Sequence, residues 1–211
     1  FTTVSDITAT ECLELIGKPV DAVLPNGFED DFVPKGAVFT KKRKVARKSI
    51  LHLANCLTGR EFADDTLIIG TSGRYEIRNK GINVFVEAMN RLLRDNRLDR
   101  QVVALIEVPA WVGIPREDLK ERYLSSKTYD TPLDYPVITH WLHNMPNDKV
   151  LDSMKYYNMW NGKDDKVVVI FVPCYLDGND GIFNIPYYDF VIGNDLSIYP
   201  SYYEPWGYTP L

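Results

Sequence analysis

Two charged residues of one loop have side chains that suit a diphosphate ligand. Arg74 and Lys80 lie in the run RYEIRNKG, which follows an apolar segment and precedes an amphipathic one. A planar guanidinium and a compact ammonium both bind phosphate oxygens strongly. Glu76 and Arg78 share the same loop, so ordinary solvated side chains are the alternative interpretation.

The last loop of the sequence, SYYEPWGYTP, contains a carboxylate, aromatic rings and a glycine. Glu204 can accept several hydrogen bonds and so orient a sugar ring, or it can serve as a cap or ion-pair partner. Trp206 offers a face for stacking. Gly207, Tyr208 and Thr209 would offer backbone N–H groups and a hydroxyl at a helix N-terminus, which favours an anion. That helix would begin where the sequence ends, so we expect a fragment of a longer domain.

Strands and helices alternate along the chain in a way that would position these loops. Apolar, β-branched runs predict buried strands, and helical spacing of apolar residues predicts helices between them. The expected strands are residues 66–70, 102–108, 167–172 and 190–198, and the expected helices are 40–56, 82–93, 116–125 and 149–157. This order predicts an α/β fold with a Rossmann-like parallel sheet and helices on both faces. Loops at the carboxyl ends of such strands form the binding site.

Shorter elements are expected at the N-terminus, where residues 1–4 and 21–24 read as strands. Ser5 is a good N-cap for a helix over residues 6–15, which Gly17 would end. The helix at 40–56 begins with a basic run from Lys41 to Lys48. A solvated helix face explains that run better than a polyanion site does.

Composition and charge exclude several classes of function. The 211 residues carry a net charge of −5, which argues against nucleic-acid and anionic membrane partners. Cys12, Cys56 and Cys174 form no CxxC pair, so a reducing, cytoplasmic compartment is expected. His140 and His143 would share one face of a helix, but the sequence places no acidic or cysteine ligand beside them. We therefore predict structural histidines and no metal site.

Three ordered stretches of the chain resemble the animal and fungal type of glycogen synthase. They are FTTVSDIT…LPNG at the start, TLIIGTSGRYEIRNKG in the middle and SYYEPWGYTP at the end. The resemblance implies a GT-B glycosyltransferase with two Rossmann-like domains. It makes residues 1–35 an interdomain segment from the edge of the N-terminal domain, and 36–211 the nucleotide-sugar domain, truncated at its C-terminus.

The resemblance also implies an activity and roles for particular residues. The parent enzyme would transfer glucose from UDP-glucose to the nonreducing end of an α-1,4-glucan with retention and without a metal cofactor. Arg74 and Lys80 would hold the diphosphate, Glu204 would lie near the donor sugar, and Tyr187 would stack on the uracil. The backbone of Tyr175 would read the base, although a packed surface tyrosine explains Tyr187 nearly as well.

Other functions stay open on the sequence alone. One is another retaining glycosyltransferase with a different sugar nucleotide, and another is a non-catalytic nucleotide-binding module. The expected partners are UDP or UDP-glucose, a glucan bound through the N-terminal domain, and a second copy of the chain in a homo-oligomer. The 211 residues alone are predicted to be inactive, because half of the cleft is missing.

Overall fold

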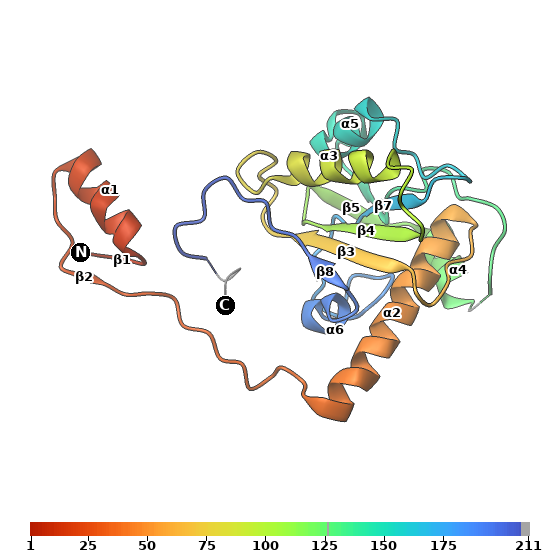
Figure 1. Cartoon of the computed structure of the whole chain (residues 1–211), viewed down its shortest axis with the longest axis horizontal. Coiled ribbons are helices and arrows are strands. Elements are labelled where there is room, and N and C mark those ends of the chain that lie inside the picture. The colour runs from red at the N-terminus through yellow and green to blue at the C-terminus, as the bar shows by residue number, and fades with distance from the viewer. Residues whose placement is uncertain (126, 208–211) are drawn as a thin grey trace.

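A four-stranded parallel sheet forms the centre of the computed structural model, which describes residues 1–125 and 127–207 (Figure 1). Its strand order is β7-β4-β3-β8. The bounds are Leu67–Ser72 for β3, Val102–Glu107 for β4, Val167–Phe171 for β7 and Leu196–Ser197 for β8. Each neighbouring pair of strands is parallel. The expected parallel α/β sheet is therefore confirmed.

Helices cover both faces of this sheet, as predicted (Figure 1). Successive side chains of a strand point to opposite faces, so Ala104 joins one hydrophobic cluster and Leu105 the other. On one face lie α3 (Ile82–Leu93) and α5 (Lys149–Tyr156). On the other lie α2 (Gly36–Thr58), α4 (Glu117–Leu124) and α6 (Tyr187–Val191). The sheet is packed between these two layers, which fixes where the loops at its carboxyl ends begin.

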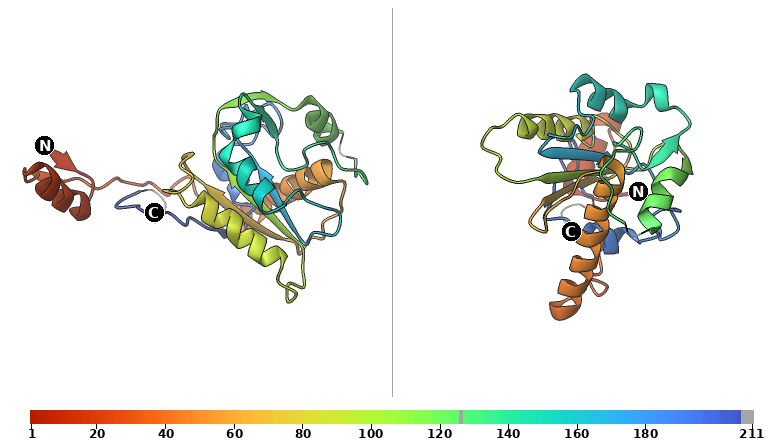
Figure 2. Two further views of the ribbon diagram at one scale, coloured as in Figure 1. Left: turned by 90° about the horizontal axis from the view of Figure 1, so that it is seen from above. Right: turned by 90° about the vertical axis from the view of Figure 1, so that its right-hand side faces the viewer.

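The N-terminal elements lie apart from the sheet, at the end of an extended segment (Figure 2). The short strands β1 (Thr2–Thr3) and β2 (Ala22–Val23) pair in parallel beside α1 (Asp6–Ile16). Ser5 caps α1 as predicted, and Gly17 ends it with φ of 67°. No residue of α1 is buried. A contact to the last loop comes from the Tyr203 hydroxyl, which donates to Glu11 Oε2 at 2.5 Å.

The strand expected at 190–198 is much shorter than predicted. Residues 190 and 191 belong to α6, and only Leu196–Ser197 form a strand. The turn between them is fixed by Asp195, whose carboxylate accepts the backbone N–H of Ile68 at 2.8 Å. Arg43 and Arg47 of α2 also bind that carboxylate. Contacts with residues far away in the sequence therefore determine the conformation of residues 190–198.

The structure contains an antiparallel pair of strands that the sequence pattern did not predict. It consists of β5 (Val112–Pro115) and β6 (His140–Leu142), and a short 3-10 helix, η1 (Met145–Asn147), follows it. His140 therefore lies on a strand, and its predicted helical spacing with His143 is wrong. Among the residues described, no helix has the length and apolar character needed to cross a membrane.

Candidate functional site

Two loops that are far apart in the sequence meet at the N-terminal end of α3. The backbone N–H of Tyr202 donates to the carbonyl of Asn79 at 2.8 Å. Gly81, with φ of 66°, allows the last loop to pass: a Cβ added there would lie 1.9 Å from the carbonyl oxygen of Pro200. A residue with a side chain at this position would push the loops apart. These contacts bring the loop of residues 73–81 and the loop of residues 199–207 together.

Lys80 and Glu204 form an ion pair where these loops meet. The Lys80 side chain is 14% exposed and that of Glu204 is 25% exposed, so both are largely shielded from water. Gly207 packs on the same carboxylate: an added Cβ would lie 2.0 Å from Glu204 Oε1. The structure thus brings together three of the predicted site residues.

Arg74 lies in the same loop, but its side chain is not drawn into this cluster. Its guanidinium is 74% exposed and pairs with Glu76 at 3.0 Å. Both predicted phosphate-binding cations therefore have a glutamate partner in this structure, Glu76 for Arg74 and Glu204 for Lys80. An incoming diphosphate would compete with these two carboxylates for the cations.

A cavity of about 300 Å³ opens at the carboxyl ends of β3, β4 and β7. Tyr175 and Tyr187, the two predicted base-binding residues, both line it. The Tyr187 hydroxyl lies 2.6 Å from Ser72 Oγ. Gly73 also lines the cavity, and a Cβ added to it would lie 3.9 Å from the Lys80 side chain. The aromatic cavity and the Lys80 cluster are therefore neighbours at one edge of the sheet.

The remaining predicted ligand residues are less well placed or lie elsewhere. Trp206 is 36% exposed in the last loop, and no contact of its ring with the cavity is seen within residues 1–125 and 127–207. Tyr208 and Thr209 lie outside the described residues. Their predicted backbone and hydroxyl contacts to the diphosphate stay predictions.

Glu107 lines the same cavity and was not among the predicted residues. It is 5% exposed, and burial raises the pKa of its carboxyl from 4.5 to about 8, although a hydrogen bond from Asn194 opposes the rise. The sequence holds one clue to it, because a single carboxylate ends the otherwise apolar run VVALIE. It lies at the edge of the sheet where α/β folds bind ligands, and strongly shifted pKa values are common at functional sites.

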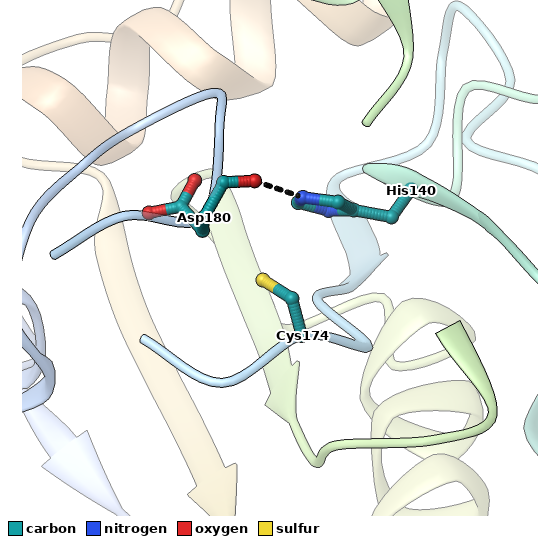
Figure 3. A group of neighbouring side chains, drawn as sticks. All are labelled: His140, Cys174 and Asp180. Carbon is teal, nitrogen blue, oxygen red and sulfur yellow. Dashed lines mark hydrogen bonds between the residues drawn. The ribbon is translucent and has the colours of Figure 1, made fainter. Parts of the chain in front are cut away.

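Beside this cavity lies a group of three side chains of types that can bind a metal: His140, Cys174 and Asp180 (Figure 3). Their ligand atoms lie within 4.8 Å of one another. His140 Nε2 donates to the carbonyl of Asp180 at 3.0 Å, and Nδ1 lies 2.9 Å from Thr139 Oγ1, so both ring nitrogens are engaged. Burial lowers the pKa of His140 and raises that of Cys174 to about 12. A neutral imidazole and a protonated thiol with these partners fit a structural role.

The Asp180 carboxylate in this group caps its own loop. It accepts the backbone N–H groups of Ile182, Phe183 and Asn184 at 2.7 to 2.9 Å. His143, the second predicted structural histidine, packs its ring 5.3 Å from that of Trp111. These contacts support the structural role predicted for both histidines.

The basic run of α2 is partly structural rather than a solvated face. Lys42 pairs with Asp189 at 2.7 Å, while Arg43 and Arg47 each pair with Asp195 at 2.6 Å. Arg43 also donates to the carbonyls of residues 192 and 194. Half of the basic side chains thus fasten α2 to α6 and to the turn before β8, and they are not available to a polyanion.

Comparison with known proteins relates the whole chain to one family. The sequence model described as glycogen synthase matches residues 1–131 and 114–211. Glycogen [starch] synthase isoform 2 of Saccharomyces cerevisiae is 30% identical over 279 aligned positions, which cover 100% of this chain and 39% of that protein. The Neurospora crassa glycogen [starch] synthase is 28% identical, covering 100% and 38%. The human liver glycogen [starch] synthase is 26% identical, covering 100% and 37%.

The matches cover only part of each relative, and they contain gaps. The chain spans less than two fifths of the length of the curated relatives that it matches. The alignments are also longer than the chain, 268 positions for the human protein against 211 residues, so the relatives have residues within this region that this chain lacks. With the parallel sheet, the two joined loops and the whole-chain match taken together, the chain belongs to the glycogen synthase family.

Proposed function

We propose that the chain is the sugar-nucleotide-binding part of a retaining glycosyltransferase. The parent protein transfers glucose from UDP-glucose to the nonreducing end of an α-1,4-glucan. The observation that carries this proposal is the meeting of Lys80 and Glu204, which are 124 residues apart, beside the cavity of Tyr175 and Tyr187. One edge of the sheet thus offers a cation, a carboxylate and aromatic rings for the three parts of such a donor.

Each part of the donor has its own binding group in this proposal. Lys80 and Arg74 neutralise the diphosphate as it leaves, which lowers the barrier by stabilising charge where it develops. Glu204 then turns from Lys80 to the hydroxyls of glucose. Backbone N–H groups near Gly207 face the same phosphates. Because two cations supply the positive charge, this proposal needs no metal ion.

Retention of the anomeric configuration is part of this proposal, and the carboxylates of the site bear on how it is achieved. Retaining glycosidases use a pair of carboxyl groups, one of them a nucleophile. Glu204 pairs with Lys80, and Gly207 packs against its carboxylate; our proposal assigns it no second carboxylate as a catalytic partner. A front-face displacement, in which the acceptor attacks from the side that the diphosphate leaves, accounts for retention without a covalent intermediate.

The acceptor and further partners belong to the same proposal. The glucan would bind through a second domain, across the cleft from residues 36–207, and residues 1–35 would form the connection to that domain. A homo-oligomer and a cytoplasmic location are further expectations. Because catalysis depends on orienting both substrates, these 211 residues alone should not elongate a glucan.

Assays of the full-length parent distinguish the proposed function from two alternatives, a different retaining transferase and a non-catalytic nucleotide-binding module. Turnover of UDP-glucose, ADP-glucose and GDP-mannose by the full-length parent distinguishes a glycogen synthase from a different retaining transferase. Turnover with ADP-glucose or GDP-mannose but not with UDP-glucose would replace our proposal with the second. Binding of UDP without any turnover by the parent would indicate a non-catalytic nucleotide-binding module.

Replacing Arg74 with alanine should weaken UDP binding by about tenfold. A hydrogen bond between charged groups contributes about 1.5–3 kcal/mol, and the exposure of Arg74 places it at the low end of that range. Isothermal titration calorimetry of the chain with UDP measures the loss. The matched control is Arg78→Ala in the same loop, which should bind UDP like the native chain. Equal affinities for Arg74→Ala and the native chain would remove Arg74 from the site.

A further inference from the structure

The tyrosine next to Arg74 connects its loop to a helix of the domain. The Tyr75 hydroxyl donates to Asp148 Oδ2 at 2.5 Å, and it accepts the backbone N–H groups of Lys149 and Val150 at 3.1 and 3.3 Å. These partners lie 73 to 75 positions further along the chain, at the N-terminal end of α5. Because α5 lies beside α3 on one face of the sheet (Figure 1), the hydroxyl joins the loop of residues 73–81 to the packed part of the fold.

Both partners in this hydrogen bond are held in place by their surroundings. Asp148 is 5% exposed, and its Oδ1 accepts the backbone N–H groups of Val150 and Leu151 at 3.0 Å, which caps α5. The Tyr75 ring stacks on that of Phe171 at the end of β7, with ring centroids 6.3 Å apart. Burial and the bond to Asp148 raise the pKa of Tyr75, so its hydroxyl keeps the proton that it donates. A carboxylate acceptor makes this bond stronger than one between neutral groups.

The two ends of the loop are held by different parts of the molecule. Residues 79–81, at the far end, contact the last loop. Gly73, at the near end, has φ of 142°, which residues with a side chain rarely adopt. Arg74 follows it with a side chain that is 74% exposed. The Arg74 end of the loop therefore reaches the hydrophobic core through its neighbour Tyr75.

We propose that Tyr75 is a positioning residue, which holds Arg74 within reach of the diphosphate by fastening the loop to Asp148. This inference rests on the proposed function, because it takes the diphosphate as the ligand of Arg74. The backbone N–H of Glu76 donates to the carbonyl of Arg74 at 2.7 Å, so the chain turns tightly around Tyr75. A shift of the tyrosine side chain would therefore move the backbone that carries the arginine.

The hydrogen bond would act on affinity without touching the ligand. Apparent affinity falls in proportion to the fraction of molecules whose loop is in the binding-competent position. Without the bond to Asp148, the Arg74 end of the loop would leave that position more often. The lost affinity would be a part of what Arg74 itself contributes, and it would vanish when Arg74 is absent.

Removing the hydroxyl while keeping the ring tests this inference. Tyr75→Phe should bind UDP about fivefold more weakly than the native chain, which corresponds to one hydrogen bond. The double variant Arg74→Ala/Tyr75→Phe should bind UDP as Arg74→Ala does, because the two residues act as a unit. Isothermal titration calorimetry of the native chain, both single variants and the double variant measures the four affinities.

Two further variants keep the result interpretable. Asp148→Asn leaves one side-chain oxygen, which cannot both cap α5 and accept from Tyr75, so this variant should also weaken UDP binding. Tyr129→Phe is the matched control: its hydroxyl lies 2.6 Å from Ser125 Oγ, outside the two loops of the site, and its loss should leave UDP binding unchanged. Circular dichroism and urea denaturation show whether each variant is folded.

The possible outcomes separate this inference from the proposed function. Equal UDP affinities for Tyr75→Phe and the native chain would overturn the positioning role, while UDP binding and the proposed function would stand. Losses that add up in the double variant would also overturn it, because Tyr75 would then disturb the site by a route other than Arg74. If the native chain binds no UDP at all, the proposed function fails and this inference fails with it.

Discussion

Raising the pH from below 4.5 to above 8 should lower the unfolding free energy of the native chain by up to about 5 kcal/mol more than that of Glu107→Gln. The carboxyl group of Glu107 is buried, and no cation among residues 1–125 and 127–207 forms an ion pair with it, so the folded chain holds its proton until about pH 8. The unfolded chain releases that proton near pH 4.5. Between these two values the folded state binds more protons than the unfolded state, and stability must fall as the pH rises.

The sign of this effect distinguishes Glu107 from an ordinary carboxylate. A carboxyl group whose pKa is lowered by an ion pair stabilises the protein above its unfolded pKa and loses that contribution in acid. Glu107 behaves in the opposite way, because its contribution is complete below pH 4.5 and is lost as the pH passes through about 8. Neighbouring Asn194 donates a hydrogen bond that reduces the shift, and the buried Tyr187 hydroxyl stays protonated throughout this window.

Urea denaturation followed by tryptophan fluorescence at several pH values measures the effect. Glu107→Gln carries no titrating proton at this position, so the difference between native and variant stabilities isolates the group. Glu87→Gln, on the solvent side of α3, is the matched control and should follow the native chain. A native-minus-variant difference that does not change with pH would mean that Glu107 titrates as an exposed carboxyl group does.

The sequence predicted most of the fold because local pattern and tertiary environment agree there. The runs that became β4 and β7 are rich in β-branched residues, and both strands are buried along their whole length. The apolar spacing at 82–93 matches α3 to the residue, and Ser5 and Gly17 mark the ends of α1. In these segments the local sequence pattern alone is enough to predict the conformation.

Prediction failed where distant residues decide the outcome. The apolar residues around 190 suit a buried strand or a buried helix equally well. The choice is made by Asp195, which binds Arg43 and Arg47 of α2 and the backbone of β3. Glu107 could not be predicted for a related reason, since the space around its carboxyl group depends on Gly70 and Asn194, and neither is near it in the sequence. The site residues Lys80 and Glu204 were identified from their loops, but their ion pair with each other was not.

Because Lys80 and Glu204 form an ion pair, substituting one or the other should change the affinity for UDP in opposite directions. Lys80→Ala should weaken binding by about a hundredfold, since a shielded cation that binds phosphate contributes toward the upper end of 1.5–3 kcal/mol. The substitution also leaves the carboxylate of Glu204 without its cation and facing the diphosphate. Glu204→Gln should instead strengthen UDP binding, because it frees the Lys80 ammonium and removes a negative charge from the site.

The gain for Glu204→Gln should appear with UDP alone and should not carry over to catalysis. In the full-length parent, the same substitution removes the group that we assign to the glucose hydroxyls, so turnover of UDP-glucose should fall while affinity for UDP rises. Calorimetry measures the affinities, and the rate of UDP formation from UDP-glucose measures the turnover. Arg78→Ala is the control and should change neither. Because the salt bridge and the diphosphate compete for one ammonium, high salt should reduce the difference between Glu204→Gln and the native chain. Weaker UDP binding by Glu204→Gln would show that Glu204 holds Lys80 in place for the phosphate and does not compete with it.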